Sequence, residues 1–350
     1  MTTNHAALRL ALAAPLFAAP GIPTMRTPSL VALSWDTVRS TIMEAERSGY
    51  DSVWFSDHLF HGRDGAFHES WTAMSVAAGF TERITLVSNH LGVPLRDARV
   101  LAKMATTISD IARGRFELFL GRGYRRREYE SYGLPWEDDQ TRTRRLSEAI
   151  RVIHEMWTGM PVDVNGEFYT TRSAISAPAS AKRPFTWVGG PLDDATLELI
   201  AASADGWNSF PLSVEEYAHA AERVDAACHA IGRDPATLRR SLETQVLVLD
   251  DDDHDDTLWQ GWLDHWRQLR TDFPLGVATS DIAPAADALS DAAVTRECRD
   301  RFIVGGPSAV ASRVAAYSAL GVTDLVCWFM DLPDLRSLHR LTDIARMVAS

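Results

Sequence analysis

Eight short apolar segments, separated by longer stretches with a different periodicity, are the feature that most limits how this chain can fold. The stretches between them place apolar residues every three or four positions, as at Leu146, Ile150 and Ile153, which is typical of amphipathic helices. Strands that alternate with such helices predict βα units on a parallel sheet. The predicted strands are Leu8–Ala13, Ser52–Ser56, Ile84–Ser88, Phe116–Gly121, Phe185–Gly189, Gly206–Phe210, Glu243–Leu249 and Asp324–Phe329.

Eight strand-helix units favour an α/β fold of the closed (β/α)8 barrel type over an open doubly wound sheet, because no G-x-G-x-x-G motif follows the first strand. The chain has 350 residues, of which 46% are hydrophobic, so we expect one large domain over residues 1–350. Two stretches exceed what a barrel needs. Met160 to Pro178 contains Asn165-Gly166 and predicts a hairpin. Asp250 to Arg301 is acidic and irregular, and predicts an insertion or lid after the seventh strand.

The charge balance argues against several classes of partner. The formal net charge is −12, which disfavours nucleic acid or an anionic membrane surface as the main partner. The cysteines are few and far apart, so the spacing indicates neither a disulfide framework nor a zinc site. They are Cys228, Cys298 and Cys327.

The apolar stretch from Leu8 to Ala19 allows a signal-peptide interpretation, but Pro15 interrupts it and Arg9 is its only nearby upstream basic residue. No segment approaches the roughly 20 apolar residues that span a bilayer. A cytoplasmic location is therefore the expectation.

Polar residues follow several predicted strands, and in a (β/α)8 barrel such residues face one common bowl. Asp57 and His58 follow the second strand, and Asn89-His90 follows the third. An imidazole beside a carboxylate is able to donate or accept a proton near pH 7. The alternative for Asp57 and His58 is a hydrogen-bonded loop pair without catalytic function.

Glycines flank the residues after the fourth and fifth strands. Arg122 lies between two glycines in Gly121-Arg122-Gly123-Tyr124, and its guanidinium offers a fork for phosphate. Gly189-Gly190 precedes a helix start, where backbone N–H groups bind anions. A tight βα turn explains Gly189-Gly190 equally well. Three aromatic residues at strand and loop ends fit either a flat ring or ordinary core packing: Trp71, Trp207 and Phe210.

Known catalytic motifs of other classes are absent from the sequence. Walker, G-x-S-x-G and H-E-x-x-H patterns do not occur, which argues against nucleotide triphosphate hydrolysis, acyl transfer and zinc chemistry, and no metal is expected.

Taken together and in order, these segments resemble the bacterial luciferase-like flavin monooxygenase family, which includes F420-dependent luciferase-like oxidoreductases. The resemblance implies a (β/α)8 barrel with insertion segments and a flavin bound in the bowl. The segments that carry it are Ala45–His58, Thr81–Ile84, Leu101–Thr107, Gly114–Phe116, Gly121–Tyr124, Arg145–Gly159, Trp187–Gly190, Ala204–Asn208 and Val304–Ser308.

The resemblance also implies roles for individual residues. Asp57 and His58 correspond to the catalytic acid and histidine beside the reactive ring edge. Asn89-His90 corresponds to a place where the family often has a non-proline cis peptide supporting the ring, and Arg122 to an arginine directed at the flavin phosphate. The implied cofactor-binding residues are Asn89, His90, Arg122, Gly123, Tyr124, Gly189 and Gly190.

The resemblance implies a monooxygenase that uses reduced FMN and oxygen on a small organic substrate. A separate flavin reductase is expected to supply the reduced FMN, because no second nucleotide-binding motif is present. An F420-dependent hydride-transfer oxidoreductase is the main alternative, because Ser56 to Phe60 is more similar to the F420 group. A non-catalytic flavin-binding homologue is a second alternative. The resemblance further implies a homodimer.

Overall fold

Eight parallel strands form a closed barrel in the computed structural model, which describes residues 8–18, 32–62, 65–179, 182–250 and 298–349. The strands are β1 (Arg9–Ala13), β2 (Ser52–Ser56), β3 (Thr85–Asn89), β5 (Phe116–Gly121), β8 (Phe185–Gly189), β9 (Gly206–Ser209), β10 (Arg239–Val248) and β12 (Asp324–Phe329). β12 joins β10 to β1, and β9 at the other end of the strand order pairs with β10, so neither edge of the barrel sheet is left open. The predicted (β/α)8 barrel is confirmed.

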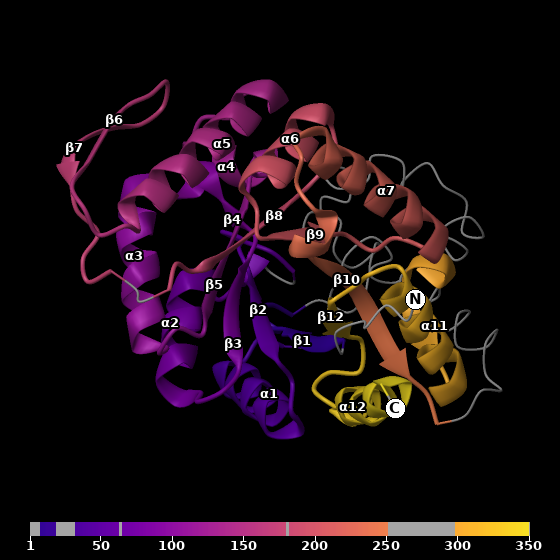
Figure 1. Ribbon diagram of the computed structural model, residues 1–350. Coiled ribbons are helices and arrows are strands. Elements are labelled where there is room, and N and C mark those ends of the chain that lie inside the picture. The colour runs from indigo at the N-terminus through magenta and orange to yellow at the C-terminus, as the bar shows by residue number, and fades with distance from the viewer. Residues whose placement is uncertain (1–7, 19–31, 63–64, 180–181, 251–297, 350) are drawn as a thin grey trace.

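Helices cover the outside of the barrel (Figure 1). Side-chain caps fix several helix starts: Ser213 forms a capping box with Glu216, and Asp193 accepts from the backbone N–H of Thr196. The main helices are α1 (Trp35–Ser48), α2 (Ser70–Phe80), α3 (Ala98–Ile111), α5 (Asp139–Met156), α6 (Asp194–Ser203), α7 (Val214–Ala230), α11 (Pro307–Ala319) and α12 (Arg336–Ala349). Shorter elements are β4 (Leu91–Gly92), η2 (Val93–Leu95), α4 (Arg126–Ser131), η3 (Pro235–Thr237) and β11 (Ile303–Gly305).

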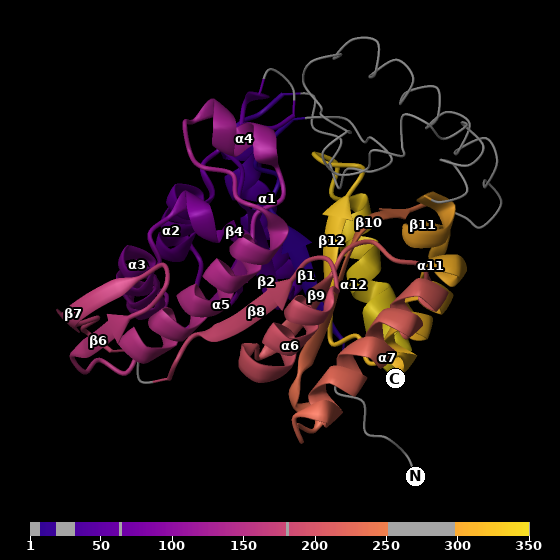
Figure 2. The same ribbon diagram turned by 90° about the horizontal axis from the view of Figure 1, so that it is seen from above.

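The two stretches beyond the barrel have different outcomes. The predicted hairpin is confirmed as the antiparallel pair β6 (Val162–Asn165) and β7 (Thr170–Ala174), beside α3 in both views (Figures 1 and 2). The Glu148 carboxylate stabilises its turn by accepting three backbone N–H groups. Most of the predicted insertion at 250–301 lies outside the described residues, which omit 251–297.

The first strand accounts for part of the apolar stretch near Leu8. β1 lies between β12 and β2 in the barrel. Its apolar residues therefore belong to the buried sheet. In the part of the chain that the structure describes, no helix combines the length and apolar character that a membrane span requires.

The barrel interior has an ionic end, an apolar middle and a polar end. At the amino-terminal end, Arg239 forms ion pairs with Glu117 and Asp324. Above them, the rings of Trp54 and Trp187 pack with centroids 5.2 Å apart. At the carboxyl end, Ser56, Asn89 and Gln245 are buried polar residues, and the Trp328 indole donates to Glu243, so the strands end in a polar layer beneath the bowl.

The larger core lies between the strands and the helices. It contains Trp71 and Trp207, and the Trp207 ring lies 5.5 Å from that of Tyr217. For both tryptophans the core-packing interpretation is confirmed. Phe210, in contrast, lies near the bowl, where its ring centroid is 6.3 Å from that of His90.

Candidate active site at the carboxyl ends of the strands

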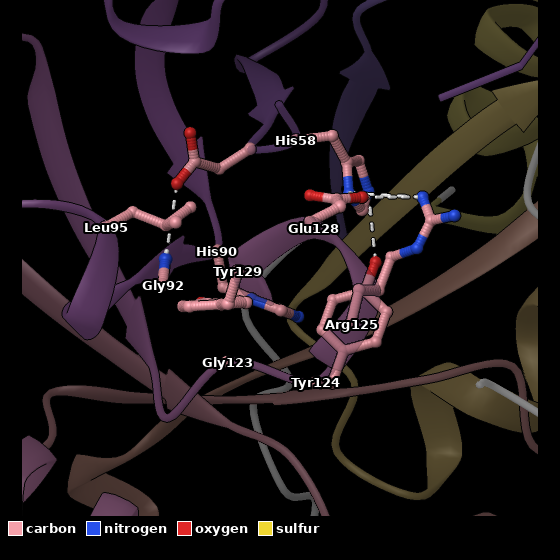
Figure 3. Close-up of a pocket in the computed structure, with 10 residues that line it drawn as sticks. His58, His90, Gly92, Leu95, Gly123, Tyr124, Arg125, Glu128 and Tyr129 are labelled. Carbon is pink, nitrogen blue, oxygen red and sulfur yellow. Dashed lines mark hydrogen bonds and ion pairs between the residues drawn. The ribbon is translucent and has the colours of Figure 1, made fainter. Parts of the chain in front are cut away.

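A small pocket at the carboxyl end of the barrel brings together residues that follow β2, β3 and β5 (Figure 3). Five of its lining residues were predicted from the sequence, and they come from three separate strand ends. The lining residues are Asp57, His58, His90, Gly92, Leu95, Gly123, Tyr124, Arg125, Glu128 and Tyr129.

His58 has hydrogen-bond partners at both ring nitrogens. Its Nδ1 lies 2.9 Å from Oε1 of Glu128, and its Nε2 lies 3.0 Å from the hydroxyl of Tyr124 (Figure 3). The side chains of His58 and Glu128 are 9% and 2% exposed, so their contact is shielded from water. The imidazole therefore links a buried carboxylate to a phenol.

Glu128 is held as a carboxylate. Its Oε1 lies 2.8 Å from Nη1 of Arg125, and its Oε2 accepts the backbone N–H of Leu59 at 3.1 Å. Burial raises the pKa of the Glu128 carboxyl, but His58, Arg125 and the Leu59 N–H together outweigh burial, so this pKa lies below its usual value.

A second imidazole lies against the first. The rings of His58 and His61 are stacked with centroids 4.8 Å apart, and Arg125 Nη1 donates to His61 Nδ1 at 2.5 Å. Burial, followed by the charges of His58 and Arg125, moves the pKa of His61 well below its ordinary value. His61 is therefore neutral at pH 7.

Asp57 is bound by an arginine rather than by the adjacent histidine. Arg96 donates to both carboxylate oxygens of Asp57, at 2.7 and 2.8 Å, and the Gly92 N–H donates at 3.2 Å. Arg96 also pairs with Glu69 at the start of α2. Asp57 thus fixes the segment after β3 beside the pocket.

Glu243 organises the polar layer beneath the bowl. Glu243 is buried, with 1% of the residue exposed. Its carboxylate accepts from Asn89 Nδ2 at 3.1 Å, Asn208 Nδ2 at 3.3 Å and Trp328 Nε1 at 2.8 Å. Among the described residues, Asn89 Oδ1 and Ser56 Oγ are buried without a hydrogen-bond partner. The two residues face each other in the register of β2 and β3. They are two adjacent buried acceptors for which the described residues supply no donor.

The peptide at Asn89-His90 corrects the backbone expectation. Among the described residues, the cis peptide bonds precede Pro178 and Pro333, and Asn89-His90 is not one of them. The cis peptide implied by the resemblance is therefore wrong for this structure. The His90 ring packs against Phe119 and Tyr124, with centroids 5.3 and 5.1 Å away.

Arg122 connects the loop after β5 to the starts of two helices. Its guanidinium donates to Asp193 at 2.7 Å, to Thr143 at 2.9 Å and to Asp139 at 3.2 Å. The side chain is 11% exposed. A phosphate bound at Arg122 therefore competes with the two carboxylates for the guanidinium.

A different physical constraint explains why glycine fits at each of the predicted positions. Gly123 has a φ of +81°, and the Tyr129 hydroxyl occupies the place where a Cβ would project. At Gly189 a Cβ would lie 2.8 Å from the Asn208 carbonyl oxygen, whereas at Gly190, with φ +135°, it would meet nothing within 4 Å. Gly123 and Gly189 thus allow close packing, and Gly190 borders open space.

Several residues of the site were missed by the sequence analysis. Arg125 belongs to a run of three arginines, Arg125 to Arg127, which is typical of a solvated helix start, yet it is buried. Glu128 lies three residues further on, so the charged pair on one helical face was the signal available. For Glu243 the signal was a charged residue at an inward position of a buried strand.

The inner layer fits a flat heteroaromatic group. Ala13, Gly121 and Gly189 are small at the carboxyl ends of their strands, and the unpartnered acceptors of Ser56 and Asn89 lie among buried surroundings. Such a surface accepts a planar ring with N–H or O–H donors. A flavin or a deazaflavin has this chemistry.

The chain belongs to the luciferase-like monooxygenase family, whose model matches residues 16–324. Its relatives include oxidoreductases of two kinds. An F420-dependent glucose-6-phosphate dehydrogenase from Beutenbergia cavernae is 36% identical over 144 residues, covering 40% of this chain and 42% of the relative. The pyrimidine monooxygenase RutA from Rhizobium rhizogenes is 31% identical over 212 residues, covering 57% and 58%. These matches span about half of the curated relatives' length, and with family membership they support an enzymatic role.

Solved structures show the same fold. An F420-dependent secondary alcohol dehydrogenase, in complex with an F420-acetone adduct, has a TM-score of 0.76 at 15% identity and covers 98% of this chain and 99% of its own. The EDTA monooxygenase EmoA from Chelativorans sp. BNC1 has a TM-score of 0.75 at 14% identity, with coverages of 98% and 94%.

Proposed function

We propose that this chain is a flavin-dependent monooxygenase that uses reduced FMN and oxygen to oxygenate a small organic substrate. The observation that carries the proposal is the polar layer with two unpartnered acceptors, directly beneath a bowl that has a buried histidine at its rim. Reduced flavin, when bound, supplies the electrons that activate oxygen. The protein's part is to hold the ring, exclude water and move protons.

The residues have distinct places in this proposal. Ser56 and Asn89 contact the ring, Arg122 and Gly190 lie where the phosphate is bound, and His58 serves proton chemistry. His90, Gly123 and Tyr124 complete the cofactor wall. Asp57 acts as a positioning residue, because both oxygens of its carboxylate accept hydrogen bonds from Arg96. A phosphate at Arg122 takes over part of the guanidinium from Asp139 and Asp193.

A separate flavin reductase is the proposed source of reduced FMN, since the sequence offers no second nucleotide motif. The proposal places the enzyme in the cytoplasm as a homodimer. Both statements follow from the family resemblance and the composition. Sedimentation of the purified chain at micromolar concentration tests the dimer, and a monomer mass contradicts it.

F420-dependent hydride transfer is the second candidate function. Two observations favour it: the similarity to F420-dependent glucose-6-phosphate dehydrogenases, at 31 to 36% identity, and the neutralisation of Arg122 by two carboxylates. An arginine that is already paired contributes less to binding the FMN phosphate.

Anaerobic titration separates the two candidates. The chain is titrated with reduced FMN and, separately, with F420, and binding is followed by fluorescence or heat. We expect saturable binding of reduced FMN in the micromolar range or tighter and weaker binding of F420. Tight F420 binding without any response to FMN contradicts the proposed cofactor and supports the second candidate.

A further inference from the structure

His58 has no ring nitrogen left for a substrate, because Glu128 occupies Nδ1 and Tyr124 occupies Nε2. An imidazole in this position is able to exchange protons with the bowl only through its neighbour. The neighbour on the Nε2 side is a phenol, which both donates and accepts hydrogen bonds.

We propose that Tyr124 is the acid-base residue that exchanges a proton with the bound reactants, and that His58 and Glu128 form a proton relay behind it. This inference rests on the proposed function for the identity of the reactants, but the relay itself is a property of the chain. Tyr124 thereby changes from a cofactor-wall residue to a catalytic one, and Glu128 becomes a positioning residue.

The relay has one consistent arrangement of protons. Glu128 Oε1 lies 2.9 Å from His58 Nδ1, and Arg125 Nη1 lies further away at 3.5 Å. Because an ionised carboxylate only accepts, the closer Glu128 fixes the proton of neutral His58 on Nδ1. Nε2 is then a lone-pair acceptor, and the Tyr124 hydroxyl donates to it over 3.0 Å. The low pKa of the Glu128 carboxyl keeps this arrangement at neutral pH.

The surroundings leave His58 as the imidazole that connects the carboxylate to the phenol. His61, stacked on it, accepts from Arg125 at Nδ1 and is neutral. The other charged groups facing His58 are Arg125, at the N-cap of α4, and Glu128, in its first turn, and they compensate each other at 2.8 Å. The Phe67 ring closes a further side, 5.3 Å from the imidazole centroid. A proton that reaches His58 is therefore stabilised by Glu128.

The proton transfer is balanced without a redox step. As a base, the Tyr124 oxygen takes a proton from a reactant while the phenol O–H bond breaks and its proton forms an N–H bond at His58 Nε2. The product is an imidazolium between Glu128 and a neutral phenol. As an acid, the same atoms return the proton in the opposite order.

The first test uses the protein without cofactor. The chain has 11 histidines, so selective 15N-histidine labelling gives a countable NMR spectrum, and a His58→Asn variant identifies the His58 signals. We expect the Nδ1–H tautomer at His58 when the ring is neutral, in contrast to the Nε2–H form that free histidine prefers. Finding Nε2–H at His58 overturns the relay.

Two variants and one control test which residue hydrogen-bonds to each ring nitrogen of His58. Glu128→Gln is expected to mix the two tautomers, whereas Tyr124→Phe keeps Nδ1–H and moves only the Nε2 signal. Tyr132→Phe is the matched control, because the Tyr132 side chain is 59% exposed and its ring stacks on Phe60 rather than on His58. Unchanged spectra in Tyr124→Phe contradict the hydrogen bond on which the proposal depends. If Glu128→Gln does not fold, the tautomer of wild-type His58 and the spectrum of Tyr124→Phe still test the relay.

Turnover then tests the role of Tyr124. Tyr124→Phe is expected to lower kcat by about 10²-fold with little change in cofactor affinity. A change in KM or affinity alone overturns the catalytic role and leaves Tyr124 as a binding residue. Because the tautomer is measured without cofactor, loss of the proposed function in the titrations is distinguishable from failure of the relay.

Discussion

Replacing His58 by asparagine separates its structural contact from its chemistry. An asparagine amide reaches roughly the place of Nδ1, so Glu128, which is 2% exposed, keeps a donor. The variant lacks any group at the place of Nε2 and is unable to take a proton. Alanine removes both the donor to Glu128 and the proton acceptor at Nε2. The two variants therefore separate what His58 contributes to stability from what it contributes to turnover.

The magnitudes follow from the contacts. Alanine leaves the buried Glu128 carboxylate with Arg125 and the Leu59 N–H, so we expect a loss of about 1–2 kcal/mol in the free energy of unfolding, from the range of about 1–3 for a buried group that loses a partner. His58→Asn should lose less of the free energy of unfolding than His58→Ala. Both variants should lose at least about 10²-fold in kcat, which corresponds to roughly 2.7 kcal/mol of transition-state stabilisation.

The assay compares kcat, cofactor affinity and urea unfolding for wild type, His58→Asn and His58→Ala. His219→Ala serves as control, since the His219 side chain is 76% exposed on α7. Cofactor affinity should stay nearly normal in all of them. Wild-type turnover in His58→Asn, or failure of both variants to fold, refutes the catalytic assignment and leaves His58 as a structural residue.

Three further predictions address other parts of the molecule. Arg122→Ala should weaken flavin binding by about one to two decades, because a charge-assisted contact contributes about 1.5–3 kcal/mol, while Arg126→Ala, at a 65% exposed side chain, should not; equal affinities in a fluorescence titration would move the phosphate away from Arg122. Gly123→Ala should lower the free energy of unfolding by roughly 2 kcal/mol or more, because its φ of +81° and the Tyr129 hydroxyl both oppose a Cβ; unchanged chemical denaturation would show that the loop relaxes freely. Burial, with the charge of Arg183, lowers the pKa of His154 to about 4. The unfolded chain therefore binds the extra proton first on acidification, and the free energy of unfolding should fall by about 1.5 kcal/mol from pH 6.5 to pH 5 through this group; His154→Gln should flatten that slope, and an unchanged slope would contradict the shift.

The fold was predictable because the strand signal is local. Short apolar runs between helical patterns placed all eight barrel strands, four of them with the observed bounds. The largest difference is β10, which begins at Arg239 rather than Glu243. Its first residues are polar because ion pairs such as Arg239 with Asp324 fill the barrel end. Hydropathy does not reveal strands whose inward residues are paired charges.

The site was predictable only in part, because its contacts are not local. Position at a strand end was enough to select His58, but adjacency in sequence suggested Asp57 as its partner. The observed partner, Glu128, is 70 residues further along, and the contact depends on where α4 packs. Likewise, nothing in the sequence pairs Arg122 with Asp193, since that contact requires the starts of α5 and α6 to converge on the loop after β5.

Rapid mixing of the chain, preloaded anaerobically with reduced FMN, with oxygenated buffer tests the central claim most directly. The account predicts that the protein changes the course of flavin reoxidation, with an absorbance transient that free reduced FMN lacks and that His58→Asn alters. A time course identical to that of free reduced FMN, together with hydride exchange on F420, would contradict it.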